Sequence, residues 1–106
     1  MNNDELKIIS NDIVAYLSMT NNEDKIFNFL RDLLSQKEIL EFSRRFEVAK
    51  MLCDKKSYTE IEQKTNMSST TIARISKFLN WENAWYSDAI SKLKSVTAKH
   101  HEGHQS

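Results

Sequence analysis

The 106-residue sequence contains no proline, and its single glycine, Gly103, lies near the C-terminus. Because glycine and proline supply most of the turns that join β-strands, their near absence predicts an all-helical fold. The lack of glycine also excludes the glycine-rich loops that hold phosphates in nucleotide-binding proteins. A chain of this length is long enough for one domain with a modest hydrophobic core.

Cysteine and long apolar stretches are equally scarce. Cys53 is the single cysteine, so the chain cannot form an internal disulfide, and we expect a reducing, cytoplasmic location. It falls in an apolar helical run, where a packed thiol is a better interpretation than a nucleophile. No apolar run reaches the length of a membrane-spanning helix and the N-terminus lacks a secretory pattern, so we expect no membrane partner.

The formal net charge is zero, but the charges are unevenly distributed. Residues 1–34 carry three basic and six acidic side chains, residues 35–80 nine and six, and residues 81–106 three and three. The positive excess therefore falls in the middle of the chain. It is small, so binding to nucleic acid would need two copies of the chain acting together.

The middle segment, residues 58–80, has the pattern of a helix-turn-helix, YTEIEQKTNMSSTTIARISKFLN. Asn66 falls at the expected turn, because asparagine is second only to glycine in tolerating a left-handed backbone. Met67 would fill the corner, and Ser68 or Ser69 would cap the second helix by accepting a hydrogen bond from its first amides. In this motif the second helix enters the major groove of DNA. The inward-facing residues are Ile61, Thr65, Ile72, Ile75 and Leu79.

The outer face of the second motif helix has the features of a DNA-binding surface. Ser69 and Thr70 are short and polar, residues 68–80 include no acidic residue, and Arg74 and Lys77 add positive charge. An ordinary helical hairpin with a solvated start would show the same inner spacing. The candidate DNA-binding residues are Lys55, Lys56, Thr59, Lys64, Ser68, Ser69, Thr70, Thr71, Ala73, Arg74 and Lys77.

The first third of the chain predicts two amphipathic helices separated by a polar break at residues 20–22. The second, from about Glu23 to Leu34, has so many large apolar residues that little of its surface would face solvent. We interpret this third as a homodimer interface, because large exposed apolar patches are rare on monomers. A self-contained monomeric bundle is the alternative.

Two further helices flank the motif. Ser35 and Glu38 form a capping box that starts a long central helix. An arginine in the middle of this helix, at position 44 or 45, is expected to pair with Glu41 or Glu47.

A last helix is expected from Trp81 to about residue 95, after a cap at Asn80. We take residues 1–96 as a single helical domain and residues 97–106 as a disordered tail. The tail contains His100, His101 and His104, but a histidine-rich tract is only a compositional hint, and no metal site is expected there.

The chain is similar to the Trp repressor superfamily in four features: the order of its six predicted helices, the SQKE capping box, Arg45 and the TTIARIS segment. Its SYTEI and SSTTIARI patterns most resemble the Trp repressor-related branch of Gram-positive bacteria. The similarity is close from about Leu33 to Leu79 and rests on helix order elsewhere. It implies an intertwined homodimer that binds double-stranded operator DNA through two helix-turn-helix heads, as a sequence-specific repressor. The positions that face bases match Ser69, Thr70 and Ala73.

The resemblance also implies a small-molecule effector pocket. In the Trp repressor, two arginines clamp the indole ring of tryptophan, and they match Arg45 and Arg74 here. Ser35 matches the threonine of that pocket. Ile75 and Phe78 stand where the tryptophan-binding protein has glycine and serine, and a phenylalanine side chain buries about 150–250 Å² by itself. The expected pocket is therefore partly filled by the chain's own side chains, and the identity of any other effector stays open.

Two other classes of function compete with DNA binding. A helical protein-interaction module would fit the zero net charge and Glu62, whose charge DNA would repel unless Lys55, Lys64 or Arg74 pairs with it. A small helical enzyme would need acid–base groups that converge on one site, and the predicted folded part contains no histidine and no suitable nucleophile. We therefore expect neither catalysis nor a bound cofactor.

We expect that tryptophan is not the corepressor of this protein. Calorimetric titration with tryptophan should give no saturable heat, because Ile75 and Phe78 add bulk where the ring would lie. Saturable binding at micromolar tryptophan would contradict this expectation.

Overall fold

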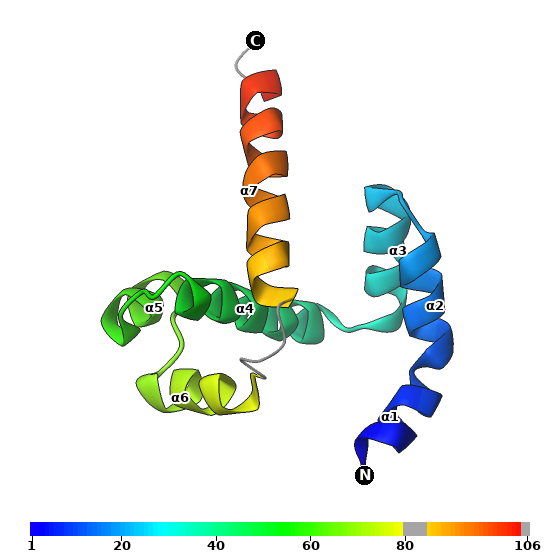
Figure 1. Ribbon diagram of the computed structural model, residues 1–106, viewed down its shortest axis with the longest axis horizontal. Helices are drawn as coiled ribbons and strands as arrows, with labels where there is room; N and C mark the ends of the chain where they lie inside the picture. Colours follow the sequence, from blue (N-terminus) through cyan, green and yellow to red (C-terminus); the bar gives the residue numbers. More distant parts are fainter. Residues whose placement is uncertain (80–84, 105–106) are drawn as a thin grey trace. The chain divides into compact units, whose positions relative to one another are not determined.

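The computed structural model describes the backbone of residues 1–79 and 85–104, and the side chains of these residues except 86 and 97–104. These residues form seven α-helices and no strand, which confirms the all-helical prediction (Figure 1). The chain divides into two compact units, Met1–Leu40 and Glu41–Ser106, so the first turn of α4 belongs to the first unit. The helices are α1 (Asn3–Ile9), α2 (Asn11–Met19), α3 (Glu23–Leu33), α4 (Gln36–Cys53), α5 (Tyr58–Thr65), α6 (Ser69–Phe78) and α7 (Trp85–His104).

The first predicted helix is interrupted at Ser10, so that α1 and α2 replace one helix. Ser10 has φ −91° and ψ 4°, and its hydroxyl donates a hydrogen bond of 2.8 Å to the carbonyl of Leu6. A serine that bonds a nearby carbonyl offers the backbone an alternative to the regular helical pattern. The side chains of Asn2 and Asn22 cap α1 and α3 by accepting from the amides three residues ahead.

The first unit has no buried side chain. Helices α2 and α3 lie side by side, and the rings of Tyr16 and Phe29 stack with their centroids 4.9 Å apart (Figure 1). Every residue from 1 to 40 is nevertheless exposed or only half-buried. A single copy of this unit therefore leaves a large apolar surface in water. The exposed large apolar residues are Met1, Leu6, Ile8, Ile9, Ile13, Val14, Tyr16, Leu17, Met19, Phe27, Leu33 and Leu40.

Helix α4 begins at the predicted capping box. The amide of Ser35 donates to Glu38 Oε1 at 2.8 Å, and the amide of Glu38 donates to Ser35 Oγ at 3.1 Å. The bond from the Ser35 backbone favours the charged carboxylate and so lowers the pKa of Glu38. Two amides that a helix start leaves without intrahelical partners are satisfied in this way, which fixes where α4 begins.

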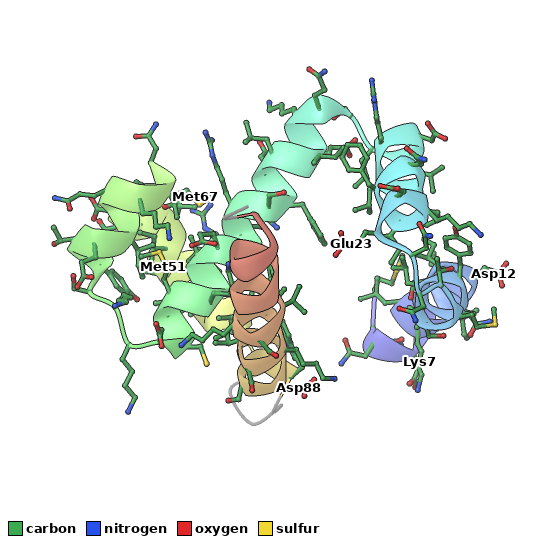
Figure 2. All side chains as sticks on the ribbon, turned by 90° about the horizontal axis from the view of Figure 1, so that it is seen from above. Lys7, Asp12, Glu23, Met51, Met67 and Asp88 are labelled. Atoms are coloured by element: carbon green, nitrogen blue, oxygen red, sulfur yellow. The ribbon has the colours of Figure 1, made fainter. Side chains whose placement is uncertain are left out.

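The second unit contains a small aliphatic core in which α4, α5 and α6 meet. Val48, Ile61 and Ile72 have no exposed surface, and Ile75 is 9% exposed. Burying a side chain of this size contributes about 1.5–3 kcal/mol. Four partly buried side chains surround the core, and two of them, Met51 and Met67, are labelled in Figure 2. These four are Met51, Leu52, Met67 and Leu79.

The C-terminus of α4 is closed by a turn in which Lys55 takes a left-handed conformation, with φ 59°. The amide of Lys55 donates to the carbonyl of Leu52 at 3.0 Å, and the amide of Lys56 donates to that of Met51 at 2.9 Å. This pair of bonds is the Schellman motif, which usually has glycine at the left-handed position. A side chain with a Cβ is strained there, so Lys55 weakens the turn that leads into the helix-turn-helix.

Helix α7 belongs to the second unit and contacts α4. The rings of Phe46 and Trp85 stack with centroids 6.4 Å apart, and Lys94 Nζ lies 3.7 Å from Asp54 Oδ1. Helix α7 continues to His104 and so includes most of the residues that the sequence predicts as a disordered tail. The predicted cap at Asn80 and helix start at Trp81 lie outside the described residues. Within residues 1–79 and 85–104, no helix is both long enough and apolar enough to cross a membrane.

Replacing Lys55 by glycine should raise the free energy of unfolding by about 0.5–1 kcal/mol. Glycine removes a left-handed strain of about 1–2 kcal/mol but adds about 0.5–1 kcal/mol of freedom to the unfolded chain. Urea denaturation at a fixed protein concentration measures the difference. Lys56→Gly is the control, since Lys56 has no positive φ and its replacement should destabilise the fold. Equal destabilisation by both substitutions would contradict the strain at Lys55.

Candidate nucleic-acid interface

The first motif helix, α5, is capped by Ser57. The hydroxyl oxygen of Ser57 accepts a hydrogen bond from the amide of Glu60 at 3.2 Å, and the hydroxyl lies 3.2 Å from Glu60 Oε1, to which it donates. Ser57 has the extended backbone, φ −70° and ψ 156°, that a helix cap requires. Thr59, whose side chain could also cap a helix, is therefore not the cap of α5. Thr59 instead lies exposed in the first turn of α5.

The turn of the motif is built as its sequence predicts. Asn66 is left-handed, with φ 59° and ψ 28°, and its amide donates to the carbonyl of Glu62 at 2.9 Å. Thr65 is buried, and its hydroxyl donates to the carbonyl of Ile61 at 2.7 Å while accepting from the amide of Met67 at 3.4 Å. These bonds and the packing of Met67 against the core fix the direction in which the chain leaves the turn.

Helix α6 starts at the predicted cap, Ser68. The hydroxyl of Ser68 accepts from the amide of Thr71 at 3.2 Å and lies 3.0 Å from the Thr71 hydroxyl. The two hydroxyls therefore form a hydrogen bond with each other. They have fewer free donors and acceptors to offer to DNA than the sequence suggests. Ser69 and Thr70 are exposed, and their side chains make no hydrogen bond within the described part of the chain.

One face of α6 is exposed, polar or small, and free of acidic residues. Thr70 is three and four residues from Ala73 and Arg74, and these two are four and three residues from Lys77, so the four residues lie on the same side of the helix. This side is opposite the buried stripe that contains Ile72. The core therefore fixes α6 by one face and presents the other to solvent.

The predicted phosphate contacts are distributed over three places in the second unit. Lys55 and Lys56 are exposed in the connection that precedes α5, and Lys77 is exposed in the last turn of α6. Lys64, in the last turn of α5, instead reaches α4, where its Nζ lies 3.1 Å from Glu47 Oε1. Three of these four lysines are therefore available to a ligand, while the fourth has an internal partner.

Glu47 bridges two lysines. Its Oε2 lies 2.7 Å from Lys50 Nζ, and its Oε1 contacts Lys64. The hydrogen bond from Lys50, with a further contribution from Lys64, lowers the pKa of Glu47. The expectation that Glu47 or Glu41 pairs with an arginine is wrong, since neither Arg44 nor Arg45 forms an ion pair with any described residue. The three-residue step from Glu47 to Lys50 was a readable signal for the first contact, but no local pattern indicates the second.

Glu62 is exposed on α5 and has no ion pair among residues 1–79 and 85–104. The sequence interpretation allowed Lys55, Lys64 or Arg74 to neutralise it. Lys64 pairs with Glu47 instead. An uncompensated carboxylate therefore remains on α5, the first helix of the motif.

The comparisons with known proteins agree with this geometry. A family model described as Trp repressor protein matches residues 10–94. The chain belongs to the Trp repressor family. It is 34% identical over 73 residues to Uncharacterized protein YerC of Bacillus subtilis (strain 168). The aligned residues cover 69% of this chain and 70% of that protein. The crystal structure of a TrpR-like protein from Eubacterium eligens ATCC 27750 is 36% identical, with a TM-score of 0.71 over 87% of this chain and 96% of that one.

These matches confirm the Trp repressor-like all-helical fold and the placement of the chain in the YerC-type branch of the superfamily. Membership of the Trp repressor family, which is a regulatory family, suggests a DNA-binding transcription regulator and not an enzyme. The described part of the chain also contains no group of three or more histidine, cysteine, aspartate or glutamate residues that could hold a metal ion.

The five residues expected at a Trp repressor-type effector pocket have different surroundings. Ser35 lies in the first unit, where its hydroxyl caps α4. Arg45 and Arg74 are exposed, Ile75 belongs to the aliphatic core, and Phe78 is 82% exposed. Within the described residues, no hydrogen bond or ion pair joins any two of the five. The bulk of Ile75 therefore fills the core of the second unit, and the effector pocket stays a prediction.

Proposed function

We propose that this protein is a sequence-specific transcriptional repressor that binds double-stranded DNA as a homodimer through its helix-turn-helix. The observation that carries the proposal is the outer face of α6, which has four exposed residues without an acidic neighbour and is held by a buried aliphatic stripe. A helix fixed by one face and free on the other fits the major groove, which admits an α-helix.

In the proposed complex, the residues at the start of α6 read bases and the lysines contact phosphates. Ser69 and Thr70 have free hydroxyls that can bond base edges or bridging waters, and the methyl group of Ala73 can contact a thymine methyl. Lys55, Lys56 and Lys77 are exposed and would fix the position of the head on the phosphate backbone. Arg74 has no ion pair within the described part of the protein and could reach either a base or a phosphate.

Two copies are needed for both energetic and geometric reasons. One head offers few cations, and the formal charge of the whole chain is zero, so a single copy gains little from phosphate attraction. The first unit exposes a dozen large apolar side chains, which a second copy would cover. A two-fold symmetric dimer would present two α6 helices to half-sites about 34 Å apart, one turn of DNA.

We also propose that a tryptophan corepressor is absent from this mechanism. The exposed ring of Phe78 lies one helical turn beyond Arg74, the arginine that would clamp the indole. Another small-molecule effector is compatible with the proposal.

A protein-interaction module remains the second candidate, and the exposed, unpaired Glu62 favours it. Salt dependence separates the two functions. Binding to a random-sequence duplex that weakens steeply as salt rises would support the repressor, whereas no binding at low salt would support the interaction module.

Thr70→Asp should weaken binding to duplex DNA by about tenfold or more, because it places a negative charge among the phosphates. The helix itself should not suffer, since an acidic residue in the first turn of α6 favours the helix dipole. Electrophoretic mobility shift measures affinity, and circular dichroism measures helicity. Ser91→Asp, an equal charge change on an exposed position of α7, should have little effect. Equal loss of affinity in both variants would sink the assignment of α6.

The homodimer should sediment at twice the 12.4 kDa mass of the chain. Phe27→Asp tests whether the apolar surface of the first unit is the dimer interface. Phe27 is 54% exposed in one copy, so a charge at this position is harmless in a monomer but is buried in a dimer. It should therefore shift the equilibrium toward single chains in sedimentation equilibrium. Asn28→Asp, on the exposed neighbouring residue, is the control. A single-chain mass at concentrations that support DNA binding would contradict the proposal.

A further inference from the structure

The carboxylate of Glu47 connects three helices of the second unit through a short series of contacts. On one side it receives Lys64 from α5. On the other it holds Lys50 of α4, whose Nζ also lies 5.5 Å from the centroid of the Phe46 ring. Phe46 in turn stacks on Trp85 of α7. The group that meets α5 is thus held in place by contacts from α4 and α7.

We infer that Glu47 is a positioning residue and that Lys64 does not contact DNA phosphate. Lys64 is instead a strut, by which we mean that its ion pair with Glu47 holds α5 in place against α4. The inference rests on the proposed DNA-binding function, since it concerns how the reading head is held. The head is defined as α5, the turn and α6.

The packing of the head explains why such a strut is needed. Its aliphatic core consists of Val48 from α4 and three isoleucines from the head. Apolar contacts are not directional, so a core this small resists separation of the helices better than it resists rotation of the head. An ion pair between fixed atoms on α4 and α5 restricts that rotation.

The geometry favours the strut over a phosphate contact. The side chain of Lys64 is 64% exposed but that of Glu47 is 27% exposed, so solvent screens this pair mainly from the lysine side and less than it screens a fully exposed pair. Each of its two oxygens contacts one lysine, so loss of Lys64 would leave one oxygen without its cation. Lys64 is the only described residue of α5 that forms an ion pair with α4.

The test compares Glu47→Gln, Lys64→Gln, the double variant and Lys64→Arg in the full-length protein. Hydrogen exchange of the α5 amides needs no DNA. Each single glutamine variant should speed exchange by about two- to fivefold, as expected for one ion pair, and the double variant should add nothing further. Lys64→Arg keeps the charge and should exchange like the parent. Lys92→Gln, which breaks the Asp88 pair within α7, should leave the α5 amides unchanged.

The same variants are then titrated with a random-sequence duplex and with a duplex selected by the parent protein. Lys64→Gln and Glu47→Gln should both reduce the preference for the selected duplex by about two- to fivefold, while the slope of affinity against salt stays that of the parent. If Lys64→Gln alone weakens binding equally on both duplexes and reduces the salt slope by about one, Lys64 is a phosphate contact and the inference is overturned. Additive or absent effects on exchange would overturn it as well.

If the parent protein binds neither duplex at low salt, the proposed function fails. The exchange measurements alone then show whether Lys64 holds α5 against α4, because the contact between Glu47 and Lys64 lies within the protein.

Discussion

The second unit depends on one contact, the meeting of four aliphatic side chains from three helices. Val48 supplies the α4 side of this cluster, Ile61 the α5 side, and Ile72 and Ile75 the α6 side. Because both motif helices contribute, the angle between them is fixed by packing as well as by the turn at Asn66. The exposed groups of α6 that are proposed to meet DNA take their position from this cluster. A charge placed inside it would have no partner and would separate the helices.

The sequence predicted the features that local patterns determine. Asn66 at the turn, the cap at the start of α6 and the capping box at Ser35 all depend on residues within a few positions of one another. A local reading also located the buried stripe of the motif, since helical spacing alone places Ile72 and Ile75 on one face. The similarity to the Trp repressor superfamily then extended these local predictions to the whole fold.

The errors arose where two local solutions compete or where distant residues meet. Both Ser57 and Thr59 can cap a helix and each has a glutamate three residues later, and in the structure Ser57 is the cap, bonded to the amide and the carboxylate of Glu60. The left-handed Lys55 carries no compositional signal, since glycine or asparagine is the usual residue there. Glu47 had nearby arginines as plausible partners, and only the packing of α5 on α4 selects Lys64. Long-range ion pairs of this kind cannot be read from spacing.

The charges of the head indicate how a protein of zero net charge would bind DNA selectively if it acts as proposed. Glu47 neutralises Lys64, and Glu62 opposes the remaining lysines, so non-specific phosphate attraction is weak for each head. Weak non-specific binding raises the share of affinity that must come from base contacts by the short residues of α6. Those contacts are sensitive to the angle of the helix in the groove, unlike long-range charge attraction. A head with few free cations therefore needs a firmly held recognition helix, which the aliphatic cluster and the contacts around Glu47 would supply together.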